Sequence, residues 1–230
     1  MPESTPPAAD HSQPEKRHNE EQDKKITNYA NDAATFLDTL LGDVELKTVA
    51  VSHGYDDAEF ALGNGYVTAL GGKVQGRQLG MGQKQDHQDT LTVTEKTVRA
   101  DYAAFRLIAR ASFPDQADRT SLGLTGDVPE DVDRFITLAT TSYTNSGLAP
   151  YTVKMTKRNY APARLATLLT QVAGLTTDEA KRNTASGGAV NTTKDRNTAY
   201  DTLRTWMKEL KGVMRGALRG QHGQLAKLKL

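Results

Sequence analysis

The sequence predicts an all-α protein, an elongated antiparallel four-helix bundle with two long and two shorter helices. Two sixteen-residue stretches, 98–113 and 203–218, carry apolar residues at steps of three and four, which places those residues on one face of a helix. Aromatic residues make up only 6% of the 230-residue chain, a composition that favours thin helical packing over a large compact core. The side chains that we expect to anchor this packing are Tyr102, Phe105, Phe113, Trp206 and Leu210.

Glycine, proline and capping residues mark the ends of the first two helices. The first helix is expected over about 17–53, with Gly54 as its terminator. The second helix is expected to begin at Asp56 or Asp57, either of which can cap it, and to extend to Phe113, where a proline follows.

The next segment is predicted to be a loop followed by a shorter helix. Leu122 and Leu124 are expected to tuck against the end of the bundle. The third helix is expected from Pro129, which suits a first helical turn, to about Ser146, and a helical turn fills 151–158.

The fourth helix is expected to open near Pro162 and to continue into the basic C-terminal stretch. Its weakest point is 184–190, where two glycines leave open whether the helix is continuous. Residues 1–16 are predicted to be a disordered tail rich in proline, and residues 221–230 a poorly tied C-terminal extension. Residues 17–220 are predicted to form a single domain.

An internal repeat relates the two halves of the chain. A shift of 105 residues carries Phe105 onto Leu210, and a shift of 106 carries Leu122 onto Leu228. Because offsets of 105 and 106 residues relate separate regions of the chain, we predict an internal duplication. The pseudo-repeats are expected at about 25–124 and 130–230.

Seven glycines lie between positions 63 and 82. With intervening alanines, four of them form a stripe of small residues at steps of three and four: Gly65, Gly72, Gly76 and Gly80. We favour a continuous helix whose stripe approaches another helix closely, so that dispersion contacts offset the poor helix propensity of glycine. A flexible loop is the alternative.

The long helices have a polar waist, at 83–97 in one and 188–199 in the other. We expect a solvated contact between helices there, and a polar cavity that binds a ligand is the alternative.

A basic stripe lies beside the apolar face of the last long helix. It consists of Arg204, Lys208, Lys211, Arg215 and Arg219. Residues 1–60 hold 13 acidic against 5 basic residues, so we expect the stripe to pair with the acids of the first helix. The acids expected to take part are Glu20, Glu21, Asp23 and Asp32. Alternatively, the stripe binds nucleic acid or an anionic membrane, or the charge separation supports head-to-tail association between copies.

The sequence contains no catalytic, metal or cofactor motif. Cysteine is absent, the five histidines share no metal-ligand spacing, and the glycine–lysine segment 70–80 lacks the GK[ST] of a phosphate-binding loop. Acid pairs such as Asp56 and Asp57 stand at expected helix starts, where capping explains them. Neither a secretory signal nor an apolar run of about 18 residues occurs, so a cytoplasmic protein is expected.

Three motifs resemble those of a group of uncharacterised bacterial helical proteins. The block FRLIARASF closes the second long helix at 105–113, LGL follows at 122–124, and the last helix carries Leu, Trp and Leu at steps of three and four over 203–210. The resemblance covers about 25–220. It implies a duplicated antiparallel four-helix arrangement and no known activity.

Together these features favour a non-catalytic structural or scaffold protein that self-associates through its helix faces as a homo-oligomer, without a small-molecule substrate. The alternative is a binding module that uses the basic C-terminal helix for nucleic acid or anionic lipid.

Overall fold

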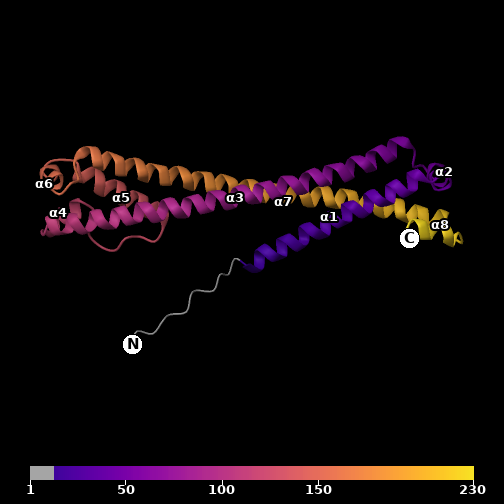
Figure 1. Cartoon of the computed structure of the whole chain (residues 1–230), viewed down its shortest axis with the longest axis horizontal. Coiled ribbons are helices and arrows are strands. Elements are labelled where there is room, and N and C mark those ends of the chain that lie inside the picture. The colour runs from indigo at the N-terminus through magenta and orange to yellow at the C-terminus, as the bar shows by residue number, and fades with distance from the viewer. Residues whose placement is uncertain (1–12) are drawn as a thin grey trace, which may run out of the picture. The chain divides into compact units, whose positions relative to one another are not determined.

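A computed structural model describes residues 13–230, with side chains described from Glu20 onward, and every regular element in this range is a helix. The all-α prediction is therefore confirmed. The chain divides into two compact units: unit 1 is the described chain up to Leu79 together with Val190–Leu230, and unit 2 is Gly80–Ala189. Figure 1 shows the helices along the chain.

Unit 1 packs three helical segments, with shorter helices at one end. Its elements are α1 (Gln13–Gly42), α2 (Val44–Ser52), α8 (His222–Lys227), and parts of α3 (Asp57–Ser112) and α7 (Pro162–Ala217). Lys73 of α3 forms an ion pair of 2.8 Å with Asp195 of α7, and Gly63 lies against Trp206, so these two segments run antiparallel.

Unit 2 contains the other parts of α3 and α7. It adds α4 (Gln116–Ser121), α5 (Val132–Ser146) and α6 (Thr152–Lys157). The ring of Phe105 on α3 lies at its centre, 4.8 Å from the ring of Tyr143 on α5 and 5.2 Å from that of Tyr160 before α7. Edge-to-face aromatic packing of this kind contributes about 0.5–1.5 kcal/mol per pair beyond burial.

The five expected anchors lie in the cores of the two units. Tyr102, Phe105 and Phe113 are buried in unit 2, and Trp206 and Leu210 are buried in unit 1. Apolar periodicity was sufficient to find them because each side chain projects inward from a long helix.

The same turn precedes both long helices. The backbone N–H of Tyr55 donates to the carbonyl of Ala50 at 3.1 Å, and that of Tyr160 donates to the carbonyl of Met155 at 2.9 Å. In both turns the preceding residue has a positive φ. The two turns are therefore alike at an offset of 105 residues.

A second shared turn follows the two long helices. The N–H of Leu124 donates to the carbonyl of Arg119 at 2.8 Å, and the N–H of Leu230 donates to the carbonyl of Leu225 at 3.1 Å. This pair lies 106 residues apart, the offset at which the sequence repeat was predicted.

The helix predicted over 17–53 is interrupted. α1 ends at Gly42, and the Asp43 carboxylate accepts hydrogen bonds from the N–H groups of Glu45 (3.0 Å) and Leu46 (3.2 Å) at the start of α2. An N-cap has extended backbone angles, so it ends one helix and begins another without disturbing the apolar pattern. At the other end, residues 13–16, predicted as tail, form the first turn of α1, while residues 1–12 of that predicted tail lie outside the described range.

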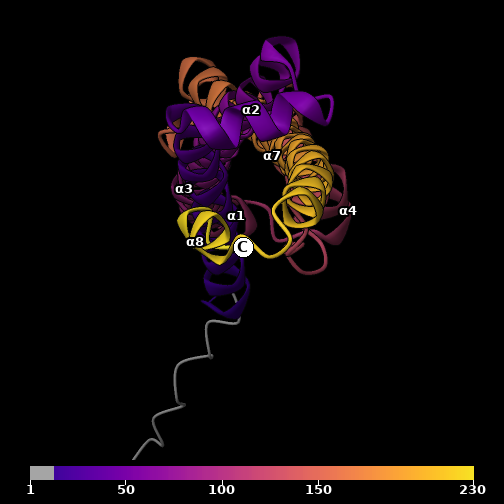
Figure 2. The same ribbon diagram turned by 90° about the vertical axis from the view of Figure 1, so that its right-hand side faces the viewer.

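Residues 221–230 are tied to unit 1, contrary to the prediction of a loose extension. Lys227 forms an ion pair of 2.6 Å with Asp43, and the amide of Gln224 donates to Glu45 at 2.5 Å. Leu228 is buried in the core of unit 1. Figure 2 shows α8 beside α1 and α2.

Both glycine-containing segments left open by the sequence, 63–82 and 184–190, are continuous helix within α3 and α7.

Candidate functional site

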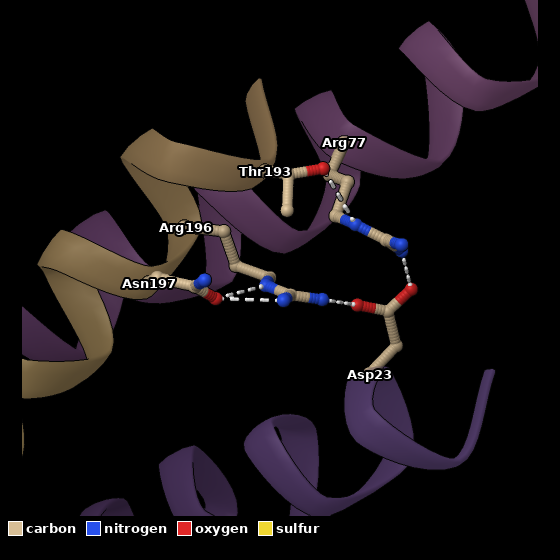
Figure 3. A network of polar contacts seen from close by, with 5 residues as sticks. All are labelled: Asp23, Arg77, Thr193, Arg196 and Asn197. Carbon is tan, nitrogen blue, oxygen red and sulfur yellow. Dashed lines mark hydrogen bonds and ion pairs between the residues drawn. The ribbon is translucent and has the colours of Figure 1, made fainter. Parts of the chain in front are cut away.

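Two buried arginines from different helices share one carboxylate on α1 (Figure 3). The Nη1 atoms of Arg77 and Arg196 donate to the two carboxylate oxygens of Asp23. Arg77 Nε also donates to Thr193 Oγ1 at 3.2 Å, while Nε and Nη2 of Arg196 donate to Asn197 Oδ1 at 3.1 and 2.7 Å. The side chains of the two arginines are 4% and 0% exposed.

This network joins α1 to α3 and α7 within unit 1. Burial lowers the pKa of Arg77, Asp23 acts in the opposite direction, and the nearby charge of Arg196 lowers it further. Arg77 still stays charged at neutral pH, because guanidinium ionises far above it. Since the guanidinium groups donate to protein acceptors, we interpret the network as structural.

A groove of about 560 Å³ lies between the α3 and α7 segments of unit 1. We call it the Trp206 groove. Its lining residues are Tyr66, Thr198, Asp201, Thr202, Thr205, Trp206 and Glu209.

The indole ring of Trp206 fits this place because α3 has no side chain at Gly63. A Cβ added at Gly63 would lie 2.2 Å from Cη2 of the ring. The rings of Tyr55 and Tyr66 stand edge-on to the indole at 6.1 and 6.4 Å, and Nε1 donates to Glu59 Oε2 at 3.4 Å. Tyr66 and Trp206 therefore form the aromatic part of the groove lining, and the Glu59 carboxylate lies beside the indole.

The groove is also acidic. Asp201, Glu209 and the adjacent Glu59 have no lysine or arginine nitrogen within 4.0 Å among the described side chains. Burial raises the pKa of Tyr55, and the charges of Glu209 and Glu59 raise it further. This combination of aromatic rings and unpaired carboxylates suits an organic cation.

Within one copy of the chain, the glycine stripe has no close helix partner at three positions. A Cβ added at Gly65, Gly72 or Gly76 would meet no atom within 4 Å, because this face of α3 points away from the core of unit 1. Gly80 is half-buried at the start of unit 2. The glycine that does permit close contact, Gly63, lies outside the stripe.

The basic stripe does not pair with the acids of α1 as expected. Among the described side chains, none of its five members has a carboxylate oxygen within 4.0 Å. Lys211 lies over the ring of Phe36 at 5.0 Å, and the other four side chains are exposed. Asp23, one of the acids expected to pair with the stripe, is instead bound by Arg77 and Arg196.

The two segments of the polar waist differ: 83–97 is largely solvated, whereas 188–199 carries the buried side chain of Arg196. Leu91 is buried, and Thr94 Oγ1 donates to Asp178 Oδ2 at 3.0 Å, while most other side chains of 83–97 are exposed.

Among the described side chains, no group of three or more histidine, aspartate or glutamate residues is placed to hold a metal ion. Within residues 13–230, no helix is long and apolar enough to cross a membrane. Comparison of the chain with protein-family models, curated proteins and solved structures gives no match. The resemblance based on 105–113, 122–124 and 203–210 therefore stays a prediction.

Proposed function

We propose that this is a non-catalytic scaffold protein that associates with itself through the exposed face of α3 in unit 1. The observation that carries the proposal is a helical stretch without charge. Residues 60–72, FALGNGYVTALGG, contain no acidic or basic side chain, although one face of this stretch is open to solvent. Exposed helix faces are normally rich in charge, and an uncharged face suits contact with another protein.

The exposed face follows the spacing of a helix-pairing seam. Its members are Leu62, Gly65, Ala69, Gly72, Gly76 and Leu79, at steps of three and four. Leu62 and Leu79 are 44% and 70% exposed, and the small residues between them leave room for another backbone. A repeat of 3.5 residues keeps such a seam facing a partner helix, and a second copy offers an identical seam.

The proposal includes the duplicated antiparallel four-helix arrangement expected from the sequence. The shared turns before and after the long helices, at offsets of 105 and 106 residues, support it.

Light scattering coupled to size-exclusion chromatography tests the proposed function. The native chain should elute at a multiple of its 25.0 kDa mass, and Ala69→Arg should lower that mass toward the monomer by placing a charge in the seam. Ala103→Arg is the matched control, because Ala103 is also exposed on α3 but lies in unit 2. A native chain that stays monomeric at all concentrations would contradict the proposal.

A further inference from the structure

We propose that the Trp206 groove binds the basic stripe of a second copy of the chain, so that copies join head to tail. The inference rests on the proposed self-association but uses a surface separate from the seam on α3.

The chemistry of the groove fits a guanidinium or ammonium group. Such a cation gains from an aromatic face and from a carboxylate at the same time. Unit 2 already uses the aromatic part of this contact: the guanidinium of Arg164 lies 4.5 Å from the ring centre of Tyr160, and that of Arg99 lies 4.3 Å from the ring centre of Phe135.

At the corresponding place in unit 1 the charge is reversed. An offset of 105 residues carries Tyr55, in the first shared turn, onto Tyr160, and carries Glu59 onto Arg164. Unit 2 thus supplies its own cation beside the tyrosine, whereas unit 1 presents a carboxylate there, with Glu209 near it. Among the described side chains, no lysine or arginine nitrogen lies within 4.0 Å of these carboxylates, so the site has room for a cation from another copy.

The basic stripe is the complementary surface. Arg204, Lys208, Arg215 and Arg219 are exposed and have no ion pair with the described side chains. Arg110 donates to the carbonyl of Leu124 at 2.8 Å, whereas the described residues accept no hydrogen bond from the side chain of Arg215, 105 positions later.

One copy does not pair the two surfaces. At 3.6 residues per turn, the groove residues of α7 and the basic stripe are centred about 110° apart around the same helix. Asp201 and Arg204 are only three positions apart, yet among the described side chains no nitrogen of the stripe lies within 4.0 Å of a groove carboxylate, which leaves both surfaces open to a second copy. Such a contact joins unlike surfaces, and it therefore propagates into a ring or a filament.

Charge reversal in the two surfaces provides the test. One variant carries Asp201→Lys and Glu209→Lys, which makes the groove basic, and the other carries Arg204→Glu and Arg215→Glu, which makes the stripe acidic. Each variant alone should associate about tenfold more weakly or worse, because it opposes like charges. An equimolar mixture should recover assembly, since each groove then meets a stripe of opposite charge on the other variant. Lys96→Glu, an exposed reversal on α3 in unit 2, is the control.

Sedimentation velocity gives the masses, and the emission of Trp206, the sole tryptophan, reports on the groove itself. Assembly that is insensitive to either reversal, or a mixture that does not recover, would overturn the inference. If the stripe reversal leaves the mass unchanged but abolishes binding to duplex DNA or to vesicles of anionic lipid, the stripe serves a phosphate-bearing partner instead, and the inference also fails.

The two proposals fail separately. If Ala69→Arg dissociates the protein and the charge reversals do not, the seam is supported and the groove contact is rejected. The opposite result would reject the seam and keep the groove contact. A monomeric native chain would reject both.

Discussion

Arg196 has no exposed side-chain surface and donates to the carboxylate of Asp23, a residue 173 positions earlier in the chain. The same carboxylate accepts from Arg77 on α3, so one acid on α1 balances two cations on the long helices. Desolvating a charge is costly unless a counter-ion and hydrogen bonds offset it. Asp23 therefore does more than any exposed acid to hold α1 against the α3 and α7 segments of unit 1.

Asp23→Asn should destabilise unit 1 by about 3–5 kcal/mol, because it leaves two buried guanidinium groups without a counter-ion. Urea unfolding followed by the fluorescence of Trp206, which lies in the same unit, measures the change. Asp32→Asn is the control: Asp32 is exposed and has no ion pair among the described side chains, so we expect a change within about 0.5 kcal/mol. Equal effects of the two substitutions would show that the network adds nothing to stability.

Gly63→Ala and Gly65→Ala should change stability in opposite directions. At Gly63 the new Cβ would lie 2.2 Å from the indole of Trp206, and displacing a packed ring costs about 1–3 kcal/mol. At Gly65 the Cβ meets nothing within 4 Å in one copy of the chain, so in the monomer helix propensity alone should stabilise the fold by up to about 1 kcal/mol.

Both effects are measured by urea unfolding, and the emission maximum of Trp206 should shift only in Gly63→Ala. A stabilised Gly63→Ala with unchanged emission would contradict the close packing of the indole on α3.

The attachment of α8 should weaken in acid. The hydrogen bond from Lys227 is the largest of the causes that lower the pKa of Asp43. A lowered pKa in the folded state means that the ion pair stabilises above the ordinary aspartate pKa of about 3.9 and is lost as the pH falls through the lower folded value. Hydrogen exchange of residues 222–230 should accordingly rise only below about pH 4.

Two substitutions at Asp43 separate its two roles. Asp43→Asn keeps a good N-cap for α2 but removes the charge, so exchange should rise in α8 and not in α2. Asp43→Ala removes both, and exchange should rise in both helices. The same exchange pattern in the two variants would mean that the cap and the ion pair are not independent.

Apolar periodicity predicts the long helices because their buried residues project inward at steps of three and four, and it carries the prediction through the glycines of α3. Apolar periodicity does not predict a helix boundary or a contact that is set by a polar group or by a glycine. Asp43 separates α1 from α2 without interrupting the apolar stripe. Gly63, against which Trp206 packs, has no side chain and so adds nothing to the apolar pattern. The packing of Trp206 and the arginine network both depend on contacts between helices that are distant in sequence, which periodicity within one helix does not reveal.

One signal of the network was nevertheless present in the sequence. Arg77 follows Leu70 and Val74 at steps of four and three, and Arg196 lies between Ala189 and Leu203 at two steps of seven. A charged residue in the register of the core predicts a buried partner of opposite charge. The partner itself, Asp23, could not be chosen from among the many acids of the first helix.

Two neighbouring tyrosines of unit 2 should respond oppositely to loss of their hydroxyl groups. The rings of Tyr102 and Tyr143 lie 5.9 Å apart in one core, so the two sites share an environment. Tyr102 Oη forms a hydrogen bond of 3.1 Å with Ser142 Oγ, whereas the buried Tyr143 Oη has no partner among the described residues. Burial raises the pKa of Tyr143, as expected for a phenol kept from water.

Tyr143→Phe should therefore stabilise the protein by about 1 kcal/mol, because it removes a buried polar group that makes no hydrogen bond. Tyr102→Phe should destabilise it by about 1 kcal/mol or more, because it leaves the hydroxyl of Ser142 buried without a partner. Chemical unfolding followed by circular dichroism measures both changes, and each variant is the control for the other. If Tyr143→Phe lost as much stability as Tyr102→Phe, the hydroxyl of Tyr143 would have a bonding partner after all.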